Sequence, residues 1–202
     1  MGCGGSKDRP DIAPITDLTK YDKWAKFELS LPFYRMYADD FEGRVKRYVN
    51  GKETVSLRQL QESFKGDSRW EDLENEESLL VQCLRSEYLR DDDNKEEINL
   101  NALLLLGILL CAGDPKLKVR IFYDILQDNL QPLISATDKD FKVNFFKLME
   151  LATKFVYEME PLSQMGRATE TKDISKIDED VFDTMKEEFL DEVYGTHSKM
   201  ER

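Results

Sequence analysis

The stretch Ile98-Asn99-Leu100-Asn101-Ala102-Leu103 has the same pattern as three others, Val55–Leu60 (VSLRQL), Val143–Leu148 (VNFFKL) and Ile177–Phe182 (IDEDVF). Each begins with a β-branched residue, continues with a short polar residue and ends with a large apolar residue. Short polar side chains commonly cap the first turn of a helix, and β-branched residues favour extended backbone. The repeat therefore predicts, four times, an extended residue that pairs with a neighbour, an N-cap and an amphipathic helix.

Apolar residues spaced like one face of a helix surround the four copies. Because 41% of the 202 residues are hydrophobic, the chain can build a core. We expect an all-α protein of helix–loop–helix pairs, with at most very short strands between paired loops. Leu103–Leu110 would form a helix that is apolar on every side, and Gly107 within it would let a second helix approach closely. Such a helix lies either in the core or along a groove for a partner's amphipathic helix.

A helix–loop–helix unit with Ile or Val at the eighth loop position, followed by a small polar residue, resembles the EF-hand. The stretch Lys116–Asp124 (KLKVRIFYD) is similar to the helix entering the third hand of recoverin-like and calcineurin B-like proteins, many of which carry an acylated Gly2. The resemblance covers roughly residues 30–195. It implies two EF-hand-like lobes, residues 25–113 and 114–195, between an N-terminal tether (1–24) and a tail (196–202).

EF-hands bind calcium through loop positions 1, 3, 5, 7, 9 and 12, with a glycine at 6 and a bidentate glutamate at 12. With Ile98 at position 8, the ligand positions of the second loop hold Asp91, Asp93, Lys95, Glu97, Asn99 and Ala102. The two leading aspartates are present, but Lys95 repels a cation and Ala102 supplies no oxygen. With Val55 at position 8, the first loop has no carboxylate at any ligand position.

The third loop has two alternative alignments. With Val143 at position 8, Lys147 takes position 12. With Ile134 there instead, Asp124 opens a loop three residues longer than usual and Asp138 closes it. The second alignment gives equal spacings of 43 residues between hands one and two and between hands three and four, which favours it.

No loop has a glutamate at position 12, including the fourth, in which Ile177 takes position 8 and Val181 position 12. We therefore expect no cofactor and no calcium binding at the affinity of a sensor. The vestigial candidates for metal ligands are Asp91, Asp93, Asn99, Asp124 and Asp138.

The N-terminal sequence Met1–Ser6 (MGCGGS) fits the acceptor pattern for N-myristoylation at Gly2. One myristoyl chain holds a membrane only marginally, so stable attachment needs a second signal. Lys7 and Arg9 are offset by nearby aspartates, so no basic patch is evident in this stretch. Cys3, beside the acylated glycine, is the expected S-palmitoylation site.

The net charge and the lack of recognisable catalytic motifs argue against a nucleic-acid-binding protein and against an enzyme. The chain has 29 Lys and Arg against 41 Asp and Glu, a net charge of −12, which argues against a nucleic-acid partner. The lone histidine, His197, lies in the polar tail and belongs to no triad or metal cluster, and no phosphate-binding or nucleophile motif is present. We expect no enzyme activity. Cys83 and Cys111 lie in apolar patterns typical of buried small residues.

Together these features predict a lipid-anchored regulatory protein or adaptor on the cytoplasmic face of a membrane, a ciliary or cortical one included. It would bind a protein partner, for instance an amphipathic helix, without calcium-dependent switching. The sequence does not indicate which residues bind the partner. Two alternatives stay open: a structural component of a cytoskeletal or ciliary assembly, and a calcium sensor with one weak site at Asp91 or Asp124.

Overall fold

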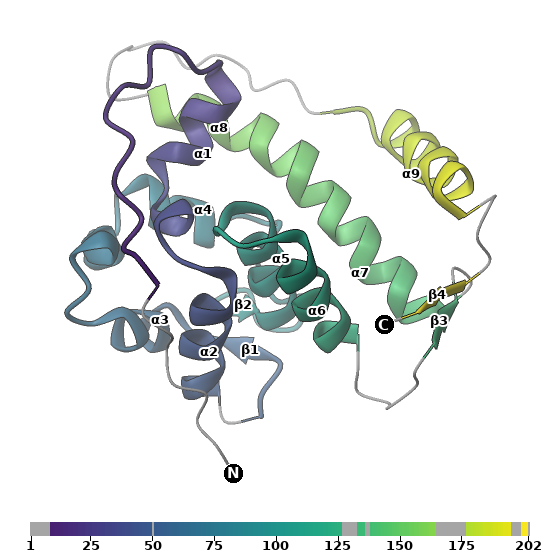
Figure 1. Ribbon diagram of the computed structural model, residues 1–202, viewed down its shortest axis with the longest axis horizontal. Coiled ribbons are helices and arrows are strands. Elements are labelled where there is room, and N and C mark those ends of the chain that lie inside the picture. Colours follow the sequence, from purple (N-terminus) through teal and green to yellow (C-terminus); the bar gives the residue numbers. More distant parts are fainter. Residues whose placement is uncertain are drawn as a thin grey trace.

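The structure is a computed structural model that describes residues 9–49, 51–126, 133–135, 138–164, 177–194 and 199–201. It is mainly helical, as predicted. The helices are α1 (Lys23–Ser30), η1 (Pro32–Arg35), α2 (Ala38–Val49), α3 (Leu57–Phe64), η2 (Ser68–Glu74), α4 (Leu79–Leu84), α5 (Leu100–Leu110), α6 (Pro115–Leu126), α7 (Lys139–Glu150), η3 (Leu151–Phe155), α8 (Val156–Gln164) and α9 (Glu179–Tyr194). The strands are β1 (Thr54–Val55), β2 (Ile98–Asn99), β3 (Leu133–Ser135) and β4 (Lys199–Glu201) (Figure 1).

The first two copies of the repeat fold as the pattern predicts. Strands β1 and β2 pair antiparallel, with Val55 opposite Ile98. The next residue in each copy is an N-cap: the Ser56 hydroxyl accepts a hydrogen bond from the backbone of α3, and the Asn99 side chain accepts one from the backbone of α5. Each strand therefore leads directly into a capped helix, because local capping signals and β-branched residues agree at both places.

For the third copy of the repeat, the structure contradicts the alignment that puts Val143 at loop position 8. Val143 is 58% exposed in the middle of α7, so it is not the extended residue of a loop. The helix begins earlier because the Asp138 carboxylate accepts hydrogen bonds from the amides of Asp140 and Phe141 and caps it. Ile134, the alternative, does lie in a strand, β3.

The pairing of β3 was not anticipated. It runs antiparallel to β4, which lies within the stretch expected to be a tail, and Ile134 faces Met200 rather than Ile177. Ile177 precedes an N-cap as the repeat predicts, since the Asp178 carboxylate accepts a hydrogen bond from the Asp180 amide at the start of α9.

Helix α5 occupies the centre of the core. All residues from Ala102 to Ile108 are buried, and α5 packs against α2, α6 and α7. The predicted central position is thus confirmed, and the helix lies in the core rather than along an open groove. Gly107 permits the close approach expected of it, because a Cβ at this position would lie 2.5 Å from Phe41 Cδ1 in α2.

Residues from both predicted lobes belong to one hydrophobic core. Helices α7, η3 and α8 follow one another along one long axis, and α1 packs against α8 (Figure 1). The rings of Trp24 and Tyr157 are 5.5 Å apart, and those of Phe27 and Phe155 are 6.2 Å apart. A boundary near residue 113 remains a prediction. In the part of the chain that the structure describes, no helix has the length and hydrophobicity needed to cross a bilayer.

Candidate functional site

The second loop uses its leading carboxylate to hold its own backbone. Asp91 Oδ1 accepts hydrogen bonds from the amides of Asp93 and Asn94, at 3.1 and 2.9 Å. The Asp91 amide in turn donates to the Glu97 carbonyl at 3.0 Å. The loop is therefore closed by hydrogen bonds between its own residues.

The later ligand positions of the same loop serve the adjoining helix and the neighbouring loop. Asn99 Oδ1 accepts from the Ala102 amide at 3.0 Å, which caps α5, and the Ala102 side chain is buried in the core. The Thr54 hydroxyl of the first loop donates to the Glu97 carboxylate. The Leu100 amide donates to the Glu53 carbonyl at 2.8 Å, so the two loops are joined by side-chain and backbone contacts besides the β1–β2 pair.

The two candidates of the third loop lie in helices or at their ends. Asp124 is in α6 and forms an ion pair with Arg120 one turn earlier, with 4.0 Å between Oδ2 and Nε. Asp138 caps α7. Within the described residues, no three histidine, cysteine or acidic side chains are grouped as metal ligands would be.

The predicted lipidation sites, Gly2 and Cys3, lie outside the described residues. The other two cysteines are buried, as the sequence indicated. Burial raises the pKa of the Cys83 thiol to about 12 and also raises that of Cys111. Because acyl transfer to sulfur needs the thiolate, burial makes Cys83 and Cys111 poor acceptors of an acyl chain.

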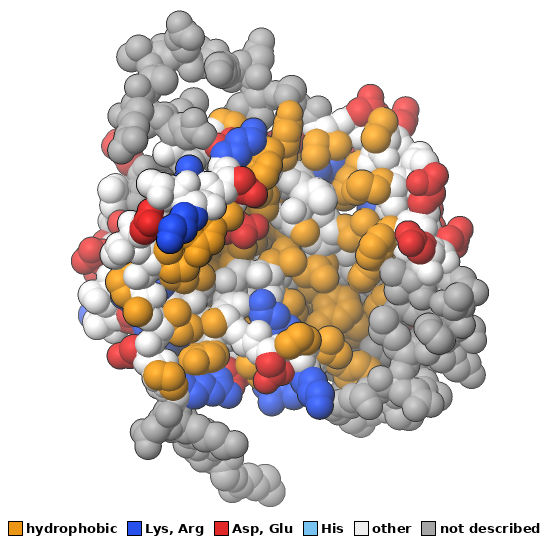
Figure 2. Space-filling model, turned by 45° about the horizontal axis from the view of Figure 1, so that its top comes forward, with side chains coloured by type: hydrophobic (Ala, Val, Ile, Leu, Met, Phe, Trp, Pro, Cys, Tyr) orange, Lys and Arg blue, Asp and Glu red, His pale blue; other side chains and the backbone are white. Residues whose placement is uncertain are grey.

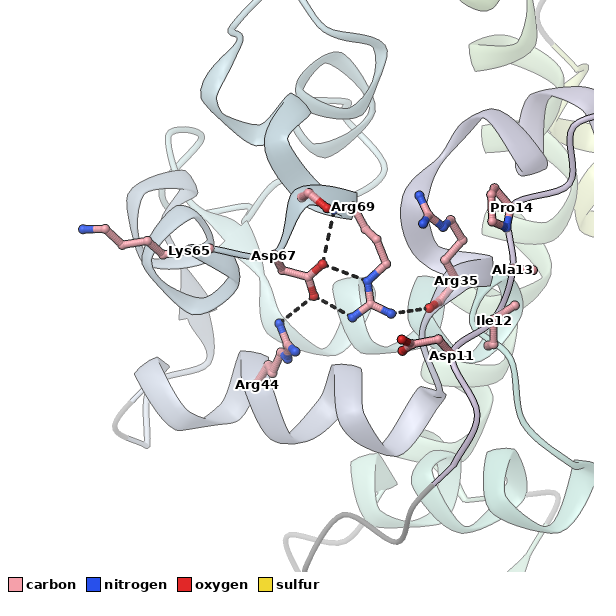
Figure 3. A pocket seen from close by; sticks show the side chains of 11 residues that line it. Asp11, Ile12, Ala13, Pro14, Arg35, Arg44, Lys65, Asp67 and Arg69 are labelled. Carbon is pink, nitrogen blue, oxygen red and sulfur yellow. Dashed lines mark hydrogen bonds and ion pairs between the residues drawn. The ribbon is translucent and has the colours of Figure 1, made fainter.

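A second candidate site lies beneath the N-terminal segment and is centred on Asp67. Its carboxylate accepts a bond from Arg69 Nη2 at 2.6 Å, one from Arg69 Nε at 2.8 Å and one from Arg44 Nη1 at 3.0 Å (Figure 3). Arg69 Nη1 donates to the Arg35 carbonyl at 2.7 Å, which links η2 to η1. The hydrogen bonds from Arg69 hold the pKa of the Asp67 carboxyl below its ordinary value.

A pocket of about 840 Å³ adjoins this cluster, and we call it the arginine pocket. Its cationic lining comes from five segments of the chain and consists of Arg9, Arg35, Arg44, Arg47, Arg69 and Arg120. Three carboxylates, those of Asp11, Asp39 and Asp40, also line it, and two more outside the lining form ion pairs with its arginines: Asp67 with Arg44 and Arg69, and Asp124 with Arg120. The sequence does not reveal this basic lining, because the arginines come from five separate segments of the chain.

No protein-family model, curated protein sequence or solved structure matches the chain.

Proposed function

We propose that the protein is an EF-hand-like, membrane-anchored, non-catalytic adaptor that binds a protein partner without a calcium switch. The observation that carries this proposal is the pairing of Val55 with Ile98 between two helix–loop–helix units, α2–α3 and α4–α5. In an EF-hand pair, the residues at position 8 of the two loops meet in this way. The pairing therefore supports the alignment that puts Asp91 and Ala102 at the first and last ligand positions of the second loop.

Calcium independence follows from that alignment. A buried alanine at position 12 cannot supply the two oxygens of a glutamate, and Lys95 places a positive charge at position 5. The contacts from Thr54 to Glu97 and from Leu100 to Glu53 link the loops through protein groups alone. The adaptor would therefore keep one shape at every calcium concentration.

An apolar stripe on α9 supports the proposal that a protein partner binds. Val181, Met185 and Phe189 are 65%, 39% and 44% exposed, and their spacing of four residues puts them on one face of the helix. This stripe is distinct from the face of α9 that packs against the protein, because Phe182 and Leu190 on that face are buried. Hydrophobic side chains also gather over the middle of the face drawn in Figure 2. Exposed apolar clusters of this kind mark protein interaction sites.

The membrane attachment is tested by fractionation of cells that express the protein. Wild type should sediment with membranes equally in calcium and in chelator, and Gly2→Ala should move to the supernatant, because it loses about 0.8 kcal/mol for each buried CH₂ of the myristoyl chain. Cys3→Ser should give partial release, since a single chain binds only marginally. Sedimentation that depends on calcium would instead favour a sensor, and membrane binding of Gly2→Ala equal to that of wild type would rule out the anchor.

The partner surface is tested by crosslinking on native membranes. Val181→Glu combined with Met185→Glu should remove the crosslinked partner, because two carboxylates cannot be buried in an apolar interface without several kcal/mol of cost. Both positions are exposed, so the fold should survive. The matched control is Val119→Glu, the same change at a 63% exposed position of α6. A partner that is retained by the α9 variant, or lost equally in the control, would show that the stripe is not the interface.

A further inference from the structure

We propose that the arginine pocket binds a multiply phosphorylated inositol headgroup presented by a membrane. The proposal goes beyond the adaptor function, and its choice of a membrane lipid as the source of the headgroup rests on the anchor proposed at Gly2. Guanidinium groups present planar forks of donors that match phosphate oxygens, so several arginines around one cavity are suited to a ligand with several phosphates. A volume of about 840 Å³ is within the range of small-molecule sites.

Two of the arginines are not engaged by protein carboxylates. Among the described residues, Arg35 and Arg47 form no ion pair, and Arg35 Nε is buried without a hydrogen-bond partner. An unsatisfied buried donor on a cation is unfavourable, and a phosphate oxygen in the pocket would satisfy it only after the Arg35 side chain turns to bring this atom to the surface. Arg47 is exposed on α2, the helix that also carries Arg44. These two side chains are the ones that a ligand would engage without breaking an existing pair.

The other arginines are held in place by the carboxylates around them. The carboxylate of Asp67, the residue before η2, accepts hydrogen bonds from Arg44 and Arg69. Arg9 Nη1 bonds Asp39 at 2.6 Å, and its guanidinium lies 4.7 Å from the centre of the Tyr37 ring. These contacts keep three of the lining arginines in fixed positions before any ligand arrives, which reduces the entropy cost of binding.

The location of the pocket favours a lipid as the source of the headgroup. Residues 9–14 line the pocket and the smaller one beside it, and the Ile15 amide donates to the Tyr34 hydroxyl at 3.2 Å, which ties this segment to η1. Gly2 precedes Arg9 by seven residues, a stretch that spans at most about 25 Å. A myristoyl chain in a bilayer would therefore keep the pocket near the lipid headgroups, where a second contact strengthens a marginal anchor.

The experiment uses full-length protein without acyl groups, so that a missing anchor and a non-binding pocket give different results. Phosphatidylcholine vesicles containing phosphatidylinositol bisphosphate should bind the protein, and vesicles with the same negative charge from phosphatidylserine should bind it much less. Arg35→Gln with Arg47→Gln should weaken binding about 25-fold, taking roughly fivefold for each arginine near the surface. Lys46→Gln removes the neighbouring cation of α2, which is not in the pocket lining, and should leave binding unchanged.

Each other outcome contradicts the proposal. Equal binding to both kinds of vesicle would show attraction to negative charge alone. Soluble inositol trisphosphate that binds as tightly as the vesicles do would show that the ligand is a soluble metabolite rather than a lipid. An unchanged affinity of the double variant, with urea unfolding the same as wild type, would place the binding site elsewhere.

Discussion

Replacing Gly107 with valine is expected to lower the free energy of unfolding by about 3 kcal/mol. The new Cβ would lie 2.5 and 2.6 Å from two carbons of the Phe41 ring. The ring cannot move aside, because Phe41 is buried against Phe33, Phe64 and Trp70, with ring centres between 5.3 and 5.9 Å away. Urea unfolding followed by circular dichroism measures the loss as a lower midpoint at an unchanged slope.

Gly43 in α2 provides the matched control for this substitution. No atom lies within 4 Å of a Cβ built on Gly43. Gly43→Val should therefore be neutral or stabilise the protein by a few tenths of a kcal/mol, because valine has a higher helix propensity than glycine. Similar losses at both positions would show that α2 and α5 do not approach each other at Gly107.

The features that the sequence predicted depend on local signals. The start of α3 and α5 follows from Ser56 and Asn99, whose side chains bond amides three residues later. The central position of α5 follows from its uninterrupted apolar run, and Gly107 was recognisable there because a glycine inside a helix needs a packing reason. In the third copy the alignment on Val143 is wrong, because the cap at Asp138 starts α7 before that residue. The alignment on Ile134, favoured by the spacing of 43 residues, puts this residue in a strand, although its partner there is Met200 rather than Ile177.

The features that were missed depend on contacts between distant residues. The arginine pocket takes Arg9, Arg35, Arg69 and Arg120 from separate segments and only Arg44 and Arg47 from one helix, so no window of sequence contains it. The β3–β4 pair joins residues about 65 positions apart, and the β4 sequence Lys-Met-Glu carries no strand pattern. Such non-local pairing is decided by the packed fold rather than by propensity.

Replacing Trp70 with alanine is expected to cost about 3–5 kcal/mol of stability, the largest loss at any single position considered. Trp70 is 3% exposed, and its ring stacks on Phe64 with 4.1 Å between centres and meets Phe33 edge-on at 5.1 Å. It thereby joins η2 to η1 and α3, and its removal would leave a cavity among rings that cannot collapse into it. Circular dichroism in urea measures this loss without relying on tryptophan emission.

Phenylalanine at the same position separates the packing of Trp70 from its polar atom. Trp70 Nε1 is buried without a hydrogen-bond partner among the described residues, and such a group costs about 1–3 kcal/mol. Trp70→Phe keeps an aromatic ring against Phe64 and removes the unpaired N–H. The relief offsets much of the lost volume, so the net loss should be only about 1 kcal/mol. If Trp70→Phe were as damaging as Trp70→Ala, the indole N–H would have to be bonded in solution. The cluster would then depend on that bond as well as on ring packing.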